Sequence, residues 1–368
     1  MGCSYHTGRF PDMSTNKPFS PLHGGNLIAA SEQYDIPLSD WIDLSTGINP
    51  EPYPIPSLDT SVYQQLPYEL PEFLQASAAY YGSTDFVAVS GTQAAIQVLP
   101  GVLPELPILI PEIGYQEHAK HWSKAGTTIT RYPSQNPAQT IRFIDQQLLE
   151  NTSQHLLIIN PNNPTGVLFE QNQLIGWAET LGKGAYLIVD EAFMDLTPEY
   201  SLLALGGFQQ PLPANVIVLR SFGKFFGLAG IRLGYIFAQP DLLAQFENVL
   251  GLWQVNGPAQ HIAIAALTDL GWQHNNQRQL QRNAEFTRNL FSPLFQKVPH
   301  QLLAESLLFT SYLVELEQAV AISRSFAESG VLLRVIDHSD SKAIVRVGVL
   351  SQNYNAASSR IEALVAAF

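Results

Sequence analysis

The sequence NVIVLRSFGKFFGLAGIRLGY spans Asn215–Tyr235, and the rest of the chain can be interpreted outward from it. It opens with Val216–Leu219, a short, β-branched, apolar run that predicts a buried strand. Lys224 follows among three phenylalanines, and these apolar walls should lower its pKa and leave free amine near neutral pH. Such an amine can form a Schiff base, and Arg232, eight residues later, can bind a phosphate through its planar donors. A surface lysine and a structural arginine would fit this stretch equally well.

Length and composition restrict the class of protein. The 368 residues suggest about two domains with ample core, and 46% hydrophobic against 14% charged residues is typical of globular proteins. The net charge of −13, from 19 basic and 32 acidic residues, lacks the basic footprint of a nucleic-acid-binding protein. No apolar run approaches the ~18 residues of a transmembrane helix, so no membrane partner is expected. The single cysteine, Cys3, excludes an intrachain disulfide and favours a cytoplasmic location.

Short apolar runs alternate with helical segments through the middle of the chain. These runs are apolar on both faces, which predicts a mostly parallel sheet covered by helices on each side. We therefore predict an α/β fold with a mostly parallel, seven-stranded sheet and a smaller α+β domain. Ligands of such sheets bind at the carboxyl ends of the strands. The predicted strands are 86–89, 106–110, 127–131, 156–159, 186–189, 216–219 and 235–238.

Domain boundaries follow from where this alternation begins and ends. Residues 1–20 lack the apolar core of a signal peptide and are predicted to be a flexible N-terminal arm. Four prolines within residues 50–56 exclude regular structure and mark a crossing between domains. We predict a large domain at 51–256 and a small domain made of 21–50 and 257–368. The other elements predicted are helices at 27–34, 71–81, 94–102, 241–255 and 275–291, and strands at 41–44, 331–335 and 343–349.

Polar residues follow the predicted strands, at the edge of the sheet where a site is expected. Gly91, Thr92 and Gln93 lie between a strand and a helix, where backbone N–H groups and the helix dipole can bind an anion. The sequence lacks the motifs GxGxxG and GxxxxGK[ST], so a single phosphate fits this turn better than a nucleotide. Tyr115, after the next strand, could stack on a flat cofactor or be an ordinary core tyrosine.

Two further residues could contact the ring of such a cofactor. Asn163 lies in the turn NPNNPTG, which two prolines make rigid, and can present its amide to a ring oxygen. Asp190 ends an apolar strand within VDEAF, and a buried carboxylate there requires a cationic partner. A protonated pyridine nitrogen would meet that requirement, and the charge pair would keep the ring electron-withdrawing.

Together these motifs resemble a known family. SFGK with an arginine eight residues after the lysine, NPNNPTG and VDEAF occur in the order found in fold-type I pyridoxal-phosphate (PLP) enzymes, the class I and II aminotransferase-like proteins. The resemblance extends over residues 23–350 and implies PLP as the cofactor, attached to Lys224 as a Schiff base. It also implies that Asp190 contacts the pyridine nitrogen, that Asn163 contacts ring O3′ and that Tyr115 stacks on the ring. The residues implied for the cofactor phosphate are Gly91, Thr92, Gln93, Ser221 and Arg232.

The sequence departs from this family at two places. Phe193 stands where many members have a tyrosine, so no phenol can reach ring O3′ from that position. Leu66 precedes Pro67 where members have a Tyr-Pro step that serves the neighbouring subunit, and Tyr63 and Tyr68 are the candidates to substitute for that tyrosine. The resemblance implies a homodimer, because the site of this family lies at a subunit boundary.

Peripheral motifs indicate one branch of the family. HGGN at 23–26, DLSTGINP at 43–50 and Y-x-E-H-x-x-x-W at 115–122 resemble the threonine-phosphate decarboxylase branch of cobalamin biosynthesis. Histidinol-phosphate aminotransferases share NPNNPTG and DEA but usually lack HGGN. The resemblance implies decarboxylation of a phosphorylated amino acid, L-threonine O-3-phosphate, to (R)-1-amino-2-propanol O-2-phosphate. Transamination by a histidinol-phosphate or related aminotransferase is the alternative, because the general motifs do not select the bond that breaks.

The substrate contacts are predicted from the same resemblance. Arg346, in AIVRVGVL, matches the arginine that grips the substrate α-carboxylate bidentately. Arg334 is a second cation near the same cleft, although a surface strand residue would also fit there. A metal is not expected, because His118 and His121 have no carboxylate or cysteine pattern to complete a site. A non-catalytic regulator with this fold is a further alternative, which the intact lysine, aspartate and asparagine argue against. The substrate-binding candidates are His23, Gly24, Asn26, Gly47, Arg334 and Arg346.

Overall fold

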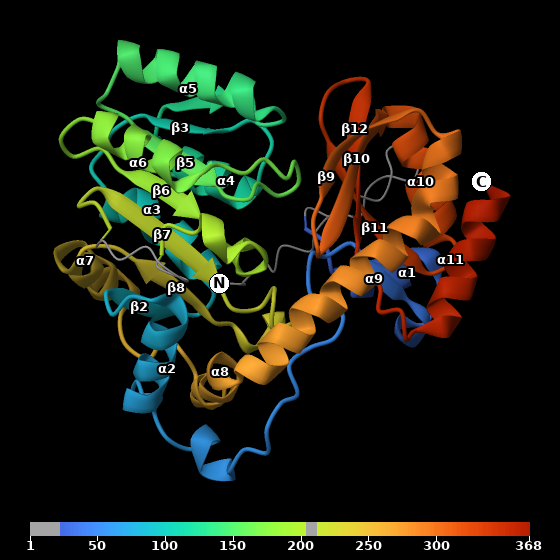
Figure 1. The fold of residues 1–368 in the computed structure, drawn as a ribbon, viewed down its shortest axis with the longest axis horizontal. Helices are drawn as coiled ribbons and strands as arrows, with labels where there is room; N and C mark the ends of the chain where they lie inside the picture. The colour runs from blue at the N-terminus through green and yellow to red at the C-terminus, as the bar shows by residue number, and fades with distance from the viewer. Residues whose placement is uncertain (1–22, 204–211) are drawn as a thin grey trace, which may run out of the picture.

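The computed structural model describes residues 23–203 and 212–368, so the arm predicted at 1–20 lies outside the described residues. Figure 1 shows two lobes side by side, with the long helix α9 (Leu270–Lys297) running from one to the other. One lobe is built on a seven-stranded sheet and the other on a five-stranded sheet. In the described part of the chain, no helix is long and apolar enough to cross a membrane.

The seven-stranded sheet has the strand order β2-β8-β7-β6-β5-β3-β4. Only β8 runs antiparallel to its neighbours, which confirms the mostly parallel sheet predicted from the sequence. The central strands are buried on both faces because they consist mainly of apolar residues without polar alternation. The strands are β2 (Phe86–Val89), β3 (Ile108–Pro111), β4 (Ile129–Tyr132), β5 (His155–Ile159), β6 (Leu187–Asp190), β7 (Val216–Ser221) and β8 (Gly234–Phe237).

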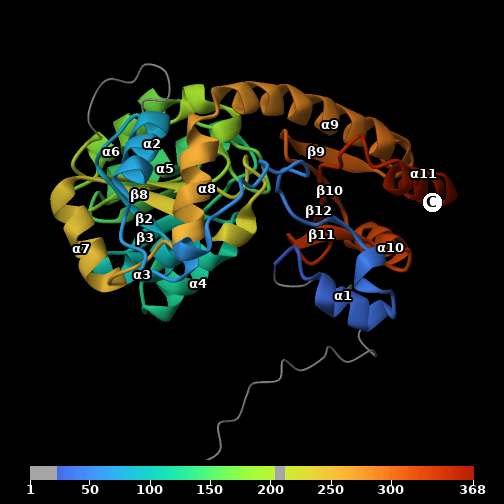
Figure 2. The same ribbon diagram turned by 90° about the horizontal axis from the view of Figure 1, so that it is seen from below.

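Helices cover both faces of this sheet, as Figure 1 and Figure 2 show from two directions. One face packs against α3, α4 and α7, and the opposite face packs against α2, α5, α6 and α8. Each face therefore contributes its own apolar cluster, and both clusters keep water away from the strands. The helices are α2 (Pro71–Tyr81), α3 (Thr92–Val102), α4 (Gln116–Lys124), α5 (Pro137–Glu150), α6 (Gln171–Thr180), α7 (Pro240–Leu250) and α8 (Gly257–Thr268).

The five-stranded sheet combines segments from both ends of the described chain. Its order is β1-β11-β12-β10-β9, with β1 parallel to β11 and the other pairs antiparallel. The domain boundaries stay a prediction. The small domain was predicted to resume at residue 257, where α8 begins, yet α8 packs against α2 in the lobe of the seven-stranded sheet. The elements are β1 (Ile42–Leu44), β9 (His300–Glu305), β10 (Phe309–Glu315), β11 (Val331–Asp337), β12 (Lys342–Gly348), α1 (Leu27–Tyr34), α10 (Leu316–Ala327) and α11 (Asn355–Ala367).

Two helices differ by more than two residues at one end or both from those predicted. The helix predicted at 241–255 was too long, because Gly251 has a φ of 78° and α7 ends just before it. Trp253, within the predicted range, therefore lies beyond the end of α7 and is 46% exposed. The helix predicted at 275–291 begins earlier and ends later, because Asp269 caps α9 by accepting from the backbone of Trp272. Short 3-10 helices lie at Leu38–Asp40, Thr60–Tyr63, Met194–Leu196, Pro198–Tyr200 and Ala229–Ile231.

Candidate active site

Two adjoining cavities lie at the carboxyl ends of β6 and β7, where the two lobes meet. The first cavity is lined by every residue predicted to bind the cofactor, and the second by His23, Gly24, Gly47, Arg334 and Arg346. The two cavities share four wall residues, so a molecule in one would touch a molecule in the other. The shared residues are Tyr115, Asn163, Phe193 and Lys224. The predicted roles of these residues stay predictions, but all of the predicted residues except Asn26 come together in space.

Lys224 lies just beyond β7, between the two cavities. Burial lowers the pKa of its amine to about 8, with further lowering by Arg346 and Arg232 against an opposing effect of Asp190. Its Nζ lies 5.6 Å from the centroid of the Phe193 ring, so an apolar ring occupies one side of the amine where water would otherwise lie. The amine therefore has an appreciable neutral fraction near neutral pH, as the sequence predicted, and a neutral amine can attack a carbonyl carbon.

Asp190, the last residue of β6, is only 3% exposed. Its Oδ2 lies 2.9 Å from Nε2 of His118, and its Oδ1 accepts from the backbone N–H of Ala192 at 3.0 Å. His118 comes from α4, one helical turn after Tyr115, and is equally buried. From the sequence, His118 stood out only within the motif Y-x-E-H-x-x-x-W and as a metal ligand without partners, so this contact was not predicted. The three-residue spacing from Tyr115 was the one available signal, because it places both side chains on one face of a helix.

The start of α3 and Arg232 form a concave polar surface that fits a phosphate. Gly91 precedes α3 with a φ of 81°, and a Cβ added to it would overlap the guanidinium of Arg232. Arg232 itself has a φ of 58° and donates to the backbone oxygens of Ala229 at 3.1 Å and Ser90 at 3.4 Å. Free N–H groups at a helix start beside an arginine attract an anion. With an amine and a buried carboxylate in the same cavity, these residues fit PLP.

Arg346, on β12, reaches from the five-stranded sheet into the other lobe. Its Nη1 donates to Oδ1 of Asn163 at 2.6 Å and its Nη2 to the backbone oxygen of Ser45 at 2.5 Å. Its Nε is buried and has no partner among the described residues. Because the Asn163 oxygen is engaged, its amide N–H₂ is the group left to meet an acceptor in the first cavity. The unpartnered Nε suits an anionic ligand in the adjoining cavity.

Arg334 and Arg346 occupy directly opposite positions on β11 and β12. Burial lowers the pKa of both guanidinium groups, that of Arg346 to about 10, where the charge of Arg334 contributes further. Like charges opposite one another on a sheet face are unfavourable unless an anion lies between them. Asp337 and Asp43 offset part of this effect, on Arg334 and Arg346 respectively. Because both guanidinium groups line the second cavity, a ligand with negative charge would fit there.

The other predicted substrate residues lie in different places. Gly24 and Gly47 allow close packing, since a Cβ on Gly24 would overlap the backbone oxygen of Ser45 and one on Gly47 would lie 3.0 Å from Phe193. Asn26 does not line either cavity; its side chain accepts from the backbone of Ala29 at 3.2 Å and caps α1. Its role in substrate binding stays a prediction.

Two remaining predictions concern a partner tyrosine and a metal. Tyr63 and Tyr68 are both exposed and line neither cavity, so their role at a subunit boundary stays a prediction. Within residues 23–203 and 212–368, no three potential ligands lie close enough together to hold a metal ion.

Comparison with known proteins gives four findings. The family model for class I and II aminotransferases matches residues 42–357. A threonine-phosphate decarboxylase from Pseudomonas aeruginosa is 43% identical over 249 residues, 67% of this chain and 71% of the relative. A histidinol-phosphate aminotransferase from Aeromonas hydrophila is 31% identical over 225 residues, 58% of this chain and 60% of the relative. The solved structure of histidinol-phosphate aminotransferase from Sinorhizobium meliloti in complex with pyridoxal-5'-phosphate is similar in fold, with a TM-score of 0.76 at 19% identity over 97% of this chain and 100% of that chain.

Proposed function

Because this chain belongs to the family of class I and II aminotransferases, we propose that it is a PLP-dependent carboxy-lyase acting on L-threonine O-3-phosphate. The products are (R)-1-amino-2-propanol O-2-phosphate and CO₂. One observation carries the proposal: Arg334 and Arg346 face each other beside Lys224, in a cavity large enough for a small doubly anionic substrate. The similarity to a threonine-phosphate decarboxylase, higher than that to a histidinol-phosphate aminotransferase, supports it.

The cofactor of this family is PLP, which supplies an aldehyde that combines with amines and a ring that withdraws electrons from the substrate Cα. We assign the start of α3 and Arg232 to its phosphate and the negative charge of Asp190 to its ring nitrogen. The amide N–H₂ of Asn163 is assigned to the ring oxygen. Tyr115, which lines both cavities, is assigned to the ring face.

The residues of the second cavity orient the substrate. Arg346 binds the α-carboxylate, and Arg334 with His23 binds the phosphate monoester. Among the described residues, Lys224 is the only amine in the walls of either cavity, and its lowered pKa lets it hold or release a proton near neutral pH. In decarboxylation the Cα–carboxylate bond breaks, CO₂ leaves, and a proton from Lys224 takes its place on Cα. Lys224 then regains a proton from solvent.

Transamination of histidinol phosphate or a related amine is the second candidate, favoured by the similarity to an aminotransferase. Lys224 would then remove a proton from Cα instead of adding one. A role in cobalamin biosynthesis, a cytoplasmic location and a homodimer are further parts of the proposal for this chain. The homodimer is supported by the exposed tyrosines near the step that members of the family use at a subunit boundary.

The test is to incubate the PLP-loaded protein with carboxyl-labelled threonine phosphate. Release of labelled CO₂ together with an equal amount of amine product is the expected result. A keto acid, with conversion of the cofactor to its amine form, would establish the aminotransferase instead. A Lys224→Ala variant serves as the control, since it should lose both turnover and the visible absorbance of the lysine-bound cofactor. Absence of turnover on either substrate would favour a non-catalytic protein.

A further inference from the structure

Glu117, in the motif Y-x-E-H-x-x-x-W, has no part in the proposed reaction and lines neither cavity. It is only 5% exposed, yet four side chains surround its carboxylate. Oε1 accepts from Nε2 of His23 and from Nζ of Lys120, each at 3.0 Å. Oε2 accepts from Nε2 of Gln93 at 2.9 Å, and Nε2 of His121 lies 3.3 Å away. One buried carboxylate thus joins the segment before α1 to α3 and α4.

The charge on Glu117 fixes the orientation of a residue in the cofactor cavity. Burial raises the pKa of Glu117, but hydrogen bonds from Lys120, Gln93 and His23 lower it overall, so the carboxylate is ionised and can only accept. Gln93 must therefore turn its amide nitrogen toward Glu117. Its oxygen is then left to accept from the hydroxyl of Tyr115, at 3.1 Å. The position of the Tyr115 ring, in the walls of both cavities, depends on this chain of two hydrogen bonds.

The same carboxylate fixes one nitrogen of His23. Because Glu117 only accepts, Nε2 of His23 must carry the donated hydrogen, which leaves Nδ1 as the nitrogen that can meet a ligand. His23 lines the second cavity together with Arg334 and Arg346, and its ring centroid lies 6.0 Å from that of Tyr115. In the imidazolium form Nδ1 donates as well, so His23 can join the guanidinium of Arg334 on the oxygens of a phosphate monoester.

We propose that Glu117 is a positioning residue that makes this site selective for phosphorylated substrates. It holds His23 at the substrate cavity and, through Gln93, holds Tyr115 between the two cavities. This inference rests on the proposed function, because it takes a phosphorylated amino acid as the substrate. The competing explanation is structural: an acidic residue in the first turn of α4 stabilises the helix whatever the site binds.

Titration of the PLP-loaded protein with inorganic phosphate separates these explanations, because the phosphate site of the cofactor is already filled. Glu117→Gln keeps the size of the side chain and removes its charge. We expect the dissociation constant of phosphate and the KM for threonine phosphate to rise about tenfold, with kcat changed less than about threefold. The matched control is Lys120→Met, which removes a 58% exposed partner of the same carboxylate and should change either constant less than about twofold.

A second variant keeps the inference testable should Glu117→Gln fail to fold. The side chain of His23 is 46% exposed, so His23→Ala should fold and show the same loss of phosphate affinity. In the double variant the two losses should not add, because both act through one hydrogen bond. A lowered melting temperature of Glu117→Gln with an unchanged phosphate dissociation constant would overturn the inference, as would an unchanged constant in His23→Ala. If the wild type releases no CO₂ from threonine phosphate, the proposed function fails, while the phosphate titration still decides the role of Glu117.

Discussion

At the scale of single residues, the contacts that matter most at this site are those of Lys224, Asp190 and Glu117. The sequence singled out residues that line the first cavity because each follows a strand or opens a helix, and strand ends meet at one edge of the sheet. It did not predict His118 or Glu117 as partners of Asp190 and His23. Those hydrogen bonds join residues 72 and 94 positions apart in the chain, and the three-residue spacing of His118 from Tyr115 is the only pattern in the sequence that points toward either of them.

The lowered pKa of Lys224 predicts how the stability of the cofactor-free protein depends on pH. The pKa is about 8 in the folded protein against a usual value of 10.5, so the unfolded chain binds more protons between these pH values. The free energy of unfolding should therefore rise with pH across that window, by about 3 kcal/mol at most. Urea denaturation of wild type and Lys224→Met at several pH values measures this. Parallel pH profiles of the two proteins would contradict it.

The contact between His118 and Asp190 predicts a cost for its removal. In His118→Phe the buried carboxylate of Asp190 keeps only its backbone donor, so we expect a loss of about 2–3 kcal/mol in the free energy of unfolding. The dissociation constant of PLP, followed by absorbance, should rise at least about tenfold, because the position of the carboxylate is no longer fixed. Stability and cofactor affinity equal to those of wild type would show that Asp190 needs no such partner.

At the scale of helices and strands, prediction from the sequence was most accurate where an apolar run was short and was followed by polar residues. The seven strands of the large sheet were predicted within two residues at each end. The end of α7 was missed because the apolar pattern continues through Leu250 to Trp253, whereas Gly251 adopts a positive φ that stops the helix. The backbone conformation of one glycine ended the helix there although the apolar pattern continues, and the sequence alone does not reveal which glycine ends a helix.

The start of α3 offers a test with an internal control. Gly91→Ala places a Cβ against Arg232 at a φ of 81°, so the dissociation constant of PLP should rise at least about tenfold. Gly101 lies in the same helix with nothing within 4 Å of an added Cβ. Gly101→Ala should therefore leave the cofactor affinity unchanged and stabilise the protein by about 0.5–1 kcal/mol. Titration with PLP and thermal unfolding of both variants give the comparison.

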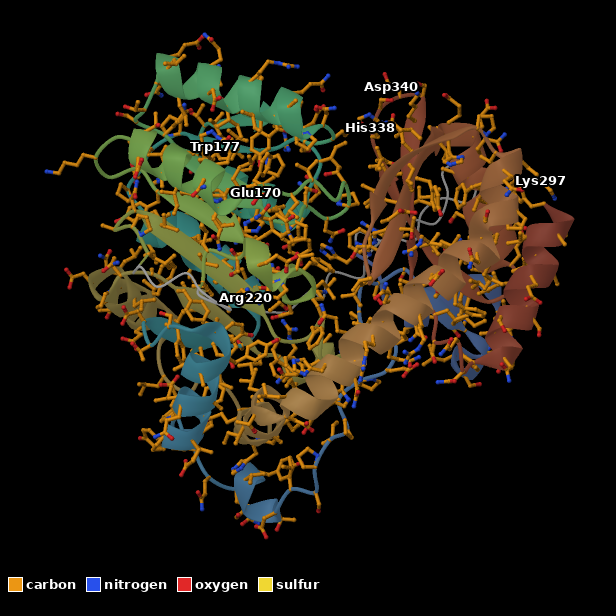
Figure 3. The ribbon with its side chains drawn as sticks, viewed as in Figure 1. Glu170, Trp177, Arg220, Lys297, His338 and Asp340 are labelled. Carbon is orange, nitrogen blue, oxygen red and sulfur yellow. The ribbon has the colours of Figure 1, made fainter. Side chains whose placement is uncertain are left out.

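The ends of β6 and β7 are tied together by a buried ion network, which Figure 3 locates by its label on Arg220. Arg220 donates to Glu191 at 3.0 Å and to Asp195, and all three side chains are almost fully buried. Arg220→Met leaves two buried carboxylates without their cation, so the free energy of unfolding should fall by about 3–5 kcal/mol. Arg288→Met, which breaks a partly exposed pair with Glu305, should cost no more than about 1 kcal/mol. Urea denaturation that gives equal losses for both would refute this ranking.

At the scale of the whole molecule, the proposed homodimer predicts a mass of twice the 40.6 kDa of one chain in sedimentation experiments. Leu66 is 60% exposed beside the exposed Tyr63 and Tyr68, so Leu66→Glu should convert dimer to monomer and lower activity. Leu149 is also exposed but lies on α5, at the opposite end of the lobe from α2 (Figure 1). Leu149→Glu should leave the mass unchanged. A wild-type chain that sediments as a monomer would remove this part of the proposal.

The parallel pairing of β1 with β11 sets an order for biogenesis on the ribosome. Ile42 lies opposite Val331, so an early strand must wait for its partner until nearly the whole chain has been synthesised. The seven-stranded sheet, complete by Phe237, can form long before that. The nascent protein would therefore have most of the first cavity in place while the five-stranded sheet, which carries Arg334 and Arg346, is still being translated. A chaperone would meet the chain in this partly folded state.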